Sequence, residues 1–300
     1  MIPTDPAKRA LMPNLFIIGA SKAGSSALHA YLRAHPAIRM SDEKEPCFFV
    51  DRAELAEAWP IMARQACSQD WDAYLTLWKG GEGARYRGEG SVYYSQSPHR
   101  SGVAARIAAA APDARILYLV REPVGRAIGH YWQRAKEFQE PLPLDQALRD
   151  NPLYRDTSDY ALQLAEYLAV FPRAQVHVVV AERLRTQRRA VLAGIFDWLQ
   201  LDAVALSDDQ ITERHTSPPT SRNARFPLVR TVRDSALWAQ ARRLLPKAAI
   251  NRLRRAATVQ YQRSDIDDSA VRAELATYFK PRIAAFETLL DEAIPEWQKP

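Results

Sequence analysis

A glycine- and serine-rich turn near the N-terminus is the first part of this 300-residue sequence that could do chemistry. An apolar run at residues 15–19 leads into the turn, and a helical pattern follows it. Backbone N–H groups at a helix N-terminus bind anions, and the helix dipole adds partial positive charge there. Lys22 supplies a mobile positive charge, while Ser25 and Ser26 supply hydroxyl donors. The turn therefore predicts a site for a phosphate or a sulfate.

The turn differs from the phosphate loop of ATP-binding proteins, whose pattern is G-x-x-x-x-G-K-[ST]. Gly19 and Gly24 have the spacing of the two glycines, but Lys22 precedes the second one and Ser25 occupies the lysine position. A kinase that uses ATP and Mg²⁺ remains an alternative. The position of the lysine and the lack of an evident acidic magnesium ligand argue against it.

Two further segments carry charged residues that such a site could use. Residues 116–132, ILYLVREPVGRAIGHYW, again predict a strand, a turn and a helix, with Arg121 just past the strand. Residues 35–49, HPAIRMSDEKEPCFF, follow the first predicted helix and contain Lys44 and Glu45.

Strands and helices alternate along the first two thirds of the chain. We predict strands over residues 15–19, 86–93, 116–120 and 176–181, and helices over residues 25–34, 103–110, 124–138, 160–170 and 183–199. This alternation is typical of a doubly wound, mostly parallel sheet. Because ligands bind at the carboxyl ends of such strands, we expect the turns at 19–25 and 121–123 to face one cleft.

The last third predicts a loop and helical segments within the same domain. Residues 215–227, HTSPPTSRNARFP, predict the loop, and residues 269–294 predict a long final helix that Pro281 kinks. The sequence shows no internal repeat, so we expect a single domain over residues 1–300.

The composition, with 47% hydrophobic and 25% charged residues, is that of an ordinary globular protein. The apolar runs are far shorter than the roughly 20 residues of a membrane span, and no secretory signal is visible. Cys47 and Cys67 form neither a disulfide framework nor a metal motif, so we expect a reducing cytoplasmic location.

The net charge of +6 is concentrated between residues 222 and 255, where ten basic residues stand against one acid, Asp234. Such a segment favours contact with an anionic surface, and a solvated helix face is an equally open interpretation. We expect no nucleic-acid partner.

Together these segments resemble the sulfotransferases that use 3′-phosphoadenosine 5′-phosphosulfate. The family's 5′-phosphosulfate loop is matched by Lys22, Gly24, Ser25 and Ser26. Its 3′-phosphate segment, which begins with an Arg, an acid and a Pro, is matched by residues 121–123. The Lys-Glu-Pro-x-Phe-Phe signature at residues 44–49 belongs to a branch that includes heparan sulfate sulfotransferases and many bacterial relatives.

The resemblance covers nearly the whole chain. Residues 88–98, GEGSVYYSQSP, look like the family's Gly-Glu-x-[ST]-Pro-x-Tyr segment, with Val92 in place of the proline, and residues 278–297 look like its closing helix and tryptophan. The resemblance implies a P-loop-like, three-layer α/β fold with a central, mostly parallel sheet flanked by helices.

The resemblance also implies the roles of individual residues. Lys22 would stabilise the bridging oxygen of the donor, and Ala23, Gly24, Ser25 and Ser26 would hold its 5′-phosphate. Arg121 would bind the 3′-phosphate. Glu45 would take the proton from the acceptor hydroxyl, and Lys44 would assist the donor or tune Glu45. Glu89 and Tyr94 would line the acceptor cleft, although a structural role suits them equally. No metal is required.

Three further positions depart from the family. The family places a serine that binds the 3′-phosphate where this chain has Gly129, and we expect Arg126, Arg222 or Arg225 to replace it. Cys47 and Val50 stand where the heparan-modifying enzymes often carry His and an acid, so a heparan-like acceptor is in question. The acceptor is expected to be a hydroxyl of a glycan, a lipid or a small molecule. A non-catalytic binding protein that kept the fold remains a second alternative.

Overall fold

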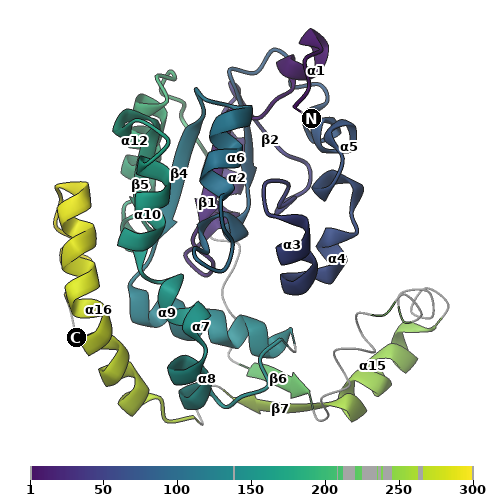
Figure 1. Ribbon diagram of the computed structural model, residues 1–300, viewed down its shortest axis with the longest axis vertical. Helices are drawn as coiled ribbons and strands as arrows, with labels where there is room; N and C mark the ends of the chain where they lie inside the picture. Colours follow the sequence, from purple (N-terminus) through teal and green to yellow (C-terminus); the bar gives the residue numbers. More distant parts are fainter. Residues whose placement is uncertain are drawn as a thin grey trace.

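A parallel sheet of five strands, in the order β2-β3-β1-β4-β5, forms the centre of the protein (Figure 1). The computed structural model describes residues 2–137, 139–207, 209–211, 220–224, 235, 238, 245–262 and 266–298. The strands are β1 (Leu15–Gly19), β2 (Ile38–Met40), β3 (Tyr86–Gly90), β4 (Arg115–Val120) and β5 (Val176–Val180). Four of them confirm predicted strands, whereas β2 was not predicted.

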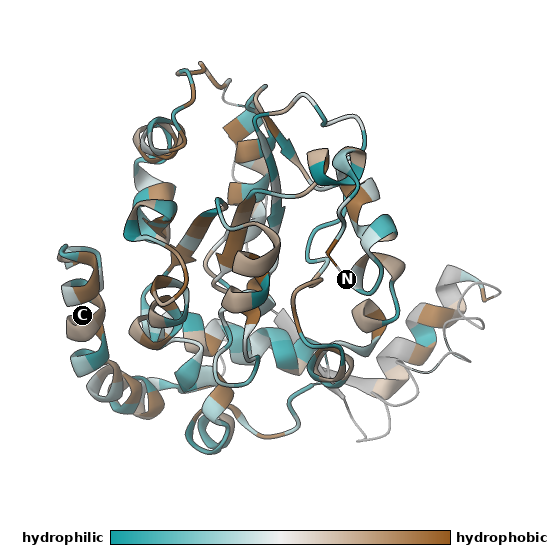
Figure 2. Ribbon diagram, turned by 45° about the horizontal axis from the view of Figure 1, so that its top comes forward, coloured by the Kyte–Doolittle hydropathy of each residue, from teal (hydrophilic) through white to brown (hydrophobic). Residues whose placement is uncertain are grey.

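The two central strands are the most buried part of the molecule. All five residues of β1 are buried, and so are five of the six residues of β4. Helices flank the sheet, so its strands can be apolar on both faces, as parallel strands usually are. Figure 2 shows brown, hydrophobic segments along the central strands and a mixture of hydrophobic and hydrophilic segments along the flanking helices. The predicted α/β class with flanking helices is confirmed.

Two helices begin at the carboxyl end of the sheet and orient the predicted site. The first, α2 (Ser25–Arg33), follows β1 after a turn that ends at Gly24, whose φ of 105° suits glycine. The second, α7 (Pro123–Lys136), follows β4 almost directly. The Glu122 carboxylate caps α7 by accepting hydrogen bonds from the backbone N–H groups of Val124 at 2.7 Å and Gly125 at 2.6 Å.

The remaining helices of the sheet domain surround these elements. They are α1 (Pro6–Ala10), α3 (Arg52–Ala58), α4 (Pro60–Ala63), α5 (Trp71–Leu75), α6 (Val103–Ala110), α8 (Leu144–Asp150), α9 (Pro152–Asp156), α10 (Tyr160–Leu168), α11 (Ala181–Thr186) and α12 (Arg188–Trp198). The single helix predicted over residues 183–199 is wrong in one respect, since it is divided into α11 and α12 at Gln187.

The C-terminal third contains a two-stranded antiparallel sheet of β6 (Thr220–Ala224) and β7 (Thr258–Gln262), with α15 (Lys247–Ala257) between them in sequence. The loop predicted over residues 215–227 is therefore wrong at 220–224, and its other residues lie outside those described. The final helix α16 (Ser269–Leu290) contains Pro281 and changes direction along its length (Figure 1). Within the described residues, no helix combines the length and apolar character needed to cross a bilayer. The single-domain organisation and the cytoplasmic location stay predictions.

Candidate functional site

A cavity of about 580 Å³ opens where β1 and β4 end and where α2 and α7 begin. It is lined by eight of the residues to which the sequence assigned a site role: Lys22, Ala23, Gly24, Ser25, Ser26, Lys44, Glu45 and Arg121. They come from three separate segments, which the parallel sheet brings to the same edge. The expectation that the turns at residues 19–25 and 121–123, after β1 and β4, face one cleft is confirmed.

The turn after β1 presents its backbone to this cavity. Its start is fixed by the N–H of Ala20, which donates to the carbonyl of Leu119 on β4 at 2.5 Å. Lys22 has a φ of 70°, a left-handed conformation that is uncommon for a residue with a side chain. Gly24 offers no side-chain cap to α2, so the N–H groups of the first helical turn depend on other acceptors. This arrangement suits an anion at the helix N-terminus.

Arg121 also lines the cavity and contacts the turn that carries Lys22. Its Nη1 donates to the backbone carbonyl of Lys22 at 3.3 Å. Gly129 lies within α7, eight residues after Arg121, and is close to both residues. A Cβ atom at position 129 would be 3.4 Å from Cβ of Lys22 and 3.9 Å from Nη1 of Arg121. The position at which the resemblance predicts a serine is therefore beside two of the basic residues of the cavity, Lys22 and Arg121.

Glu45 is held in the cavity wall by the segment that leaves β3. Its backbone N–H donates to the carbonyl of Gly90 at 3.0 Å, and its Oε2 accepts from the N–H of Val92 at 2.9 Å. The ammonium group of Lys44 pairs with Oε1. Glu45, like Lys22, has a left-handed backbone with a φ of 64°. Such conformations persist where the surrounding structure imposes them, which is frequent at functional sites.

Two predicted acceptor contacts are not supported by the structure. Glu89 is fully buried and Tyr94 is 3% exposed, and neither lines the cavity. The Tyr94 hydroxyl accepts from the backbone N–H of Phe49 at 3.2 Å, which is a structural role. Burial raises the pKa of Glu89 to about 8, so its neutral form is favoured at pH 7. These side chains belong to the core behind Glu45.

The suggestion that Arg126 replaces the missing serine is also wrong. Arg126 is fully buried, and its guanidinium donates to the Ser158 hydroxyl at 2.6 Å and to the Tyr154 carbonyl at 2.7 Å. It is engaged with the segment between α7 and α10, and it does not line the cavity.

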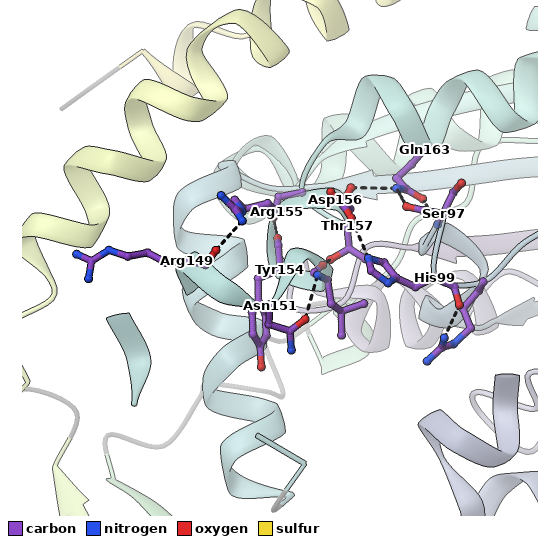
Figure 3. A network of polar contacts seen from close by, with 12 residues as sticks. Ser97, His99, Arg149, Asn151, Tyr154, Arg155, Asp156, Thr157 and Gln163 are labelled. Atoms are coloured by element: carbon purple, nitrogen blue, oxygen red, sulfur yellow. Dashed lines mark hydrogen bonds and ion pairs between the residues drawn. The ribbon is translucent and has the colours of Figure 1, made fainter. Parts of the chain in front are cut away.

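That segment is itself tied down by polar contacts (Figure 3). The Gln163 amide nitrogen donates to the carbonyls of Ser97 at 2.7 Å and Asp156 at 3.0 Å, and His99 bonds to the Asp156 carboxylate at 2.9 Å. Side-chain networks of this kind fix the positions of loops.

Two other residues were expected to replace the serine that is absent at position 129. Arg222 belongs to β6, and Arg225 lies outside the described residues.

Several cavity residues were missed by the sequence analysis. Glu182, Arg185 and Arg188 line the cavity from α11 and α12, and Gln133 lines it from α7. Glu182, Arg185 and Arg188 follow β5, whose carboxyl end lies beside that of β4. Because ligands bind at the carboxyl ends of adjacent parallel strands, a prediction that β5 is the neighbour of β4 could have located these three residues.

The fold and the cavity together define a class: an α/β protein whose cleft combines a helix N-terminus, basic side chains and a positioned carboxylate. The comparison with known proteins specifies the class further. A sequence model described as the sulfotransferase family matches residues 13–205, and the chain belongs to this family.

Curated relatives include human heparan sulfate glucosamine 3-O-sulfotransferase 3B1, which is 29% identical over 215 residues, 68% of this chain and 48% of that protein. The mouse protein of the same name is 30% identical over 217 residues, again 68% of this chain and 48% of that protein. The chain thus spans about half the length of these relatives. A crystal structure of a sulfotransferase from Alicyclobacillus acidocaldarius superimposes with a TM-score of 0.67 at 26% identity, covering 96% of this chain and 99% of that one.

Proposed function

We propose that this protein transfers a sulfuryl group from 3′-phosphoadenosine 5′-phosphosulfate to a hydroxyl of an acceptor. The observation that carries the proposal is that Lys22, Arg121 and Glu45 line one cavity. Membership of the sulfotransferase family supports this donor, and the chemistry of the cavity suits it.

The donor is an anion with phosphate groups at both ends of its ribose, and the cavity offers two cationic positions for them. The N–H groups and hydroxyls of Ser25 and Ser26, at the N-terminus of α2, would bind the 5′-phosphate. Arg121 would bind the 3′-phosphate. The bond between Arg121 and the Lys22 carbonyl keeps the two positions in a fixed relation.

Sulfuryl transfer resembles phosphoryl transfer in that positioning and charge stabilisation supply most of the catalysis. Lys22 would neutralise the negative charge that develops on the bridging oxygen as the sulfuryl group leaves. Glu45 would accept the proton of the attacking hydroxyl, a contribution typically worth about 10²–10⁴-fold in rate. Two donors, the Val92 N–H and the Lys44 ammonium, hold its carboxylate in place. We propose that Lys44 orients the base and that no metal takes part.

The acceptor is proposed to be a glycan, a lipid or a small molecule that carries a hydroxyl. The named relatives act on heparan sulfate glucosamine. In this chain Cys47 is fully buried and Val50 is 6% exposed, so neither position offers a polar contact to a saccharide. This difference argues for an acceptor other than a heparan-like chain.

The donor is tested by titration of the purified protein with 3′-phosphoadenosine 5′-phosphate and, separately, with ATP and Mg²⁺. We expect micromolar or tighter binding of the former and little binding of ATP; the reverse preference would support a kinase.

Transfer is tested by incubating the protein and donor with extracts of its host and searching for acceptors that gain one SO₃ group. Glu45→Gln should bind the nucleotide as the parent does but lose transfer. If the parent protein and Glu45→Gln showed the same background level of transfer, a non-catalytic binding protein would be favoured.

We further propose that the basic segment 222–255 contacts an anionic surface. In α15, Arg252 and Leu253 are both exposed, the latter to 48%, so this helix presents a basic and an apolar side chain to its surroundings, as helices at membrane surfaces do. Co-sedimentation with vesicles should therefore require anionic lipid and weaken in the variant Arg252→Glu. Equal binding to neutral vesicles, or none, would contradict this contact.

A further inference from the structure

Glu182 is an acidic side chain that the proposed mechanism does not use, although it lines the cavity proposed to bind an anionic donor. A carboxylate in such a cavity opposes anion binding unless it is engaged elsewhere. Both of its oxygens are engaged. Oε1 accepts from the backbone N–H of Glu122 at 3.0 Å, and Oε2 accepts from the indole Nε1 of Trp297 at 3.1 Å.

The first of these bonds reaches the turn that carries Arg121. This turn contains only two residues between the end of β4 and the start of α7. The helix bonds one of its backbone groups, since the Glu122 carbonyl accepts from the Arg126 N–H at 2.9 Å, and the other three depend on side-chain partners. The Tyr160 hydroxyl, which is also buried, donates to the Arg121 carbonyl at 2.7 Å and accepts from the Arg121 N–H at 3.3 Å. Three backbone groups of the turn are therefore held by Glu182 and Tyr160.

The second bond connects this turn to the C-terminal end of the chain. The Trp297 ring packs against Phe286 of α16, with ring centroids 5.9 Å apart and nearly parallel planes, and against Tyr160 at 5.5 Å. Arg183, the neighbour of Glu182, pairs with Glu292 and Glu296 just beyond α16. The same C-terminal segment thus contacts both of the side chains that hold the turn.

We infer that Trp297, Glu182 and Tyr160 form a C-terminal latch that positions Arg121 for the donor. Trp297 acts through Glu182 and touches no reacting atom, so it is a positioning residue. The inference rests on the proposed function, because it assigns Arg121 to the 3′-phosphate. Trp297 also lies outside the region matched by the family model, residues 13–205.

If the latch positions Arg121, the binding of 3′-phosphoadenosine 5′-phosphate depends on the indole N–H group of Trp297, near the C-terminus. The variant Trp297→Phe keeps an aromatic ring beside Phe286 and Tyr160 but lacks the indole donor. We expect its Kd for 3′-phosphoadenosine 5′-phosphate to rise about tenfold, since a hydrogen bond to a charged group is lost. Glu182→Gln keeps the size of the side chain and should also weaken binding, because its amide has one accepting oxygen for the two donors, so one of the two bonds is lost.

Calorimetric titration and thermal unfolding of the same samples distinguish this latch from a purely structural contact. Glu292→Gln is the matched control, since it removes a partner of Arg183 at the same chain end, with a 54% exposed side chain, without touching Glu182. A structural contact would lower Tm in the Trp297 and Glu182 variants and leave the Kd of the folded protein unchanged, which would overturn the inference. The latch expects a raised Kd in both variants and an unchanged Kd in the control. In a transfer assay, KM for the donor should rise while kcat changes little.

Two reference samples separate this test from that of the proposed function. If the parent protein does not bind the nucleotide, or if Arg121→Ala binds as tightly as the parent, the donor assignment fails and the latch fails with it. If both reference samples behave as proposed and the latch variants bind like the parent, the latch alone is wrong.

Discussion

Replacing Gly129 by serine should tighten the binding of the donor nucleotide. Position 129 lies within α7, beside Lys22 and Arg121. The resemblance described above predicts that a serine hydroxyl at this position would bind the 3′-phosphate. The added Cβ would stand 3.4 Å from Cβ and 3.5 Å from Cγ of Lys22, which is ordinary van der Waals contact. The site can therefore accept the larger residue without displacing the lysine turn.

The expected gain follows from the hydrogen bond that the hydroxyl would restore. A hydrogen bond to a charged group contributes about 1.5–3 kcal/mol, which corresponds to roughly 10- to 150-fold in Kd. Serine in a helix interior is also about 0.5 kcal/mol more favourable than glycine, and alanine about 1 kcal/mol more favourable. That second effect should appear in the stability of the protein and leave its affinity for the nucleotide unchanged.

Calorimetric titration with 3′-phosphoadenosine 5′-phosphate of the parent, Gly129→Ser and Gly129→Ala measures the two effects separately. The alanine variant adds the same Cβ without the hydroxyl, so it is expected to bind like the parent and to unfold at a higher temperature. The serine variant should bind the nucleotide at least about ten times more tightly than the alanine variant, because only serine offers the hydrogen bond to the phosphate. Equal affinities of the two variants would show that the 3′-phosphate does not lie at this position.

Further predictions concern groups around the site. Glu89→Gln should stabilise the protein, relative to the parent, increasingly as pH rises. The pKa of Glu89 is about 8 in the folded protein and 4.5 in the unfolded chain. Ionisation of the unfolded chain therefore has no effect on stability at low pH and destabilises the parent fold progressively between these two pH values. Urea unfolding at pH 5 and pH 8 should give a difference between variant and parent that grows by on the order of 3 kcal/mol, and a constant difference would refute it. Glu122→Ala removes the cap of α7 and should lower the free energy of unfolding by about 0.5–2 kcal/mol, measured by the same method. Arg126→Met leaves the Ser158 hydroxyl and Tyr154 carbonyl without their buried donor and should lower Tm strongly, while any protein that remains folded should still bind the nucleotide; unchanged Tm would contradict the assigned role.

The strands that form continuous apolar runs in the sequence were predictable. The apolar runs that became β1 and β4 are buried along their length, so their composition alone identified them. β2 was not found because it has three residues, with Arg39 between two buried apolar ones, too few for a period to appear. β6 lies in a stretch rich in proline, serine and threonine, where pairing with β7 overrides the local signal for a loop.

The site was predictable where a turn follows a strand and less so elsewhere. Lys22 and Arg121 stand beside strand ends, and the parallel order of the sheet brings them together. Glu89 also adjoins a strand end, but whether a polar side chain faces a cavity or the core depends on packing across the sheet. The role of Trp297 depends on contact between residues more than a hundred positions apart, which no local pattern contains.

A crystal structure of the protein with 3′-phosphoadenosine 5′-phosphate bound would test the central claim most directly. We expect the 5′-phosphate at the N–H groups of Ser25 and Ser26, beside Lys22, and the 3′-phosphate bonded to Arg121. Glu45 should then face the side of the 5′-phosphate from which the sulfuryl group departs. A nucleotide bound with its phosphates away from the lysine turn, or with Arg121 and Glu45 outside the occupied cavity, would contradict it.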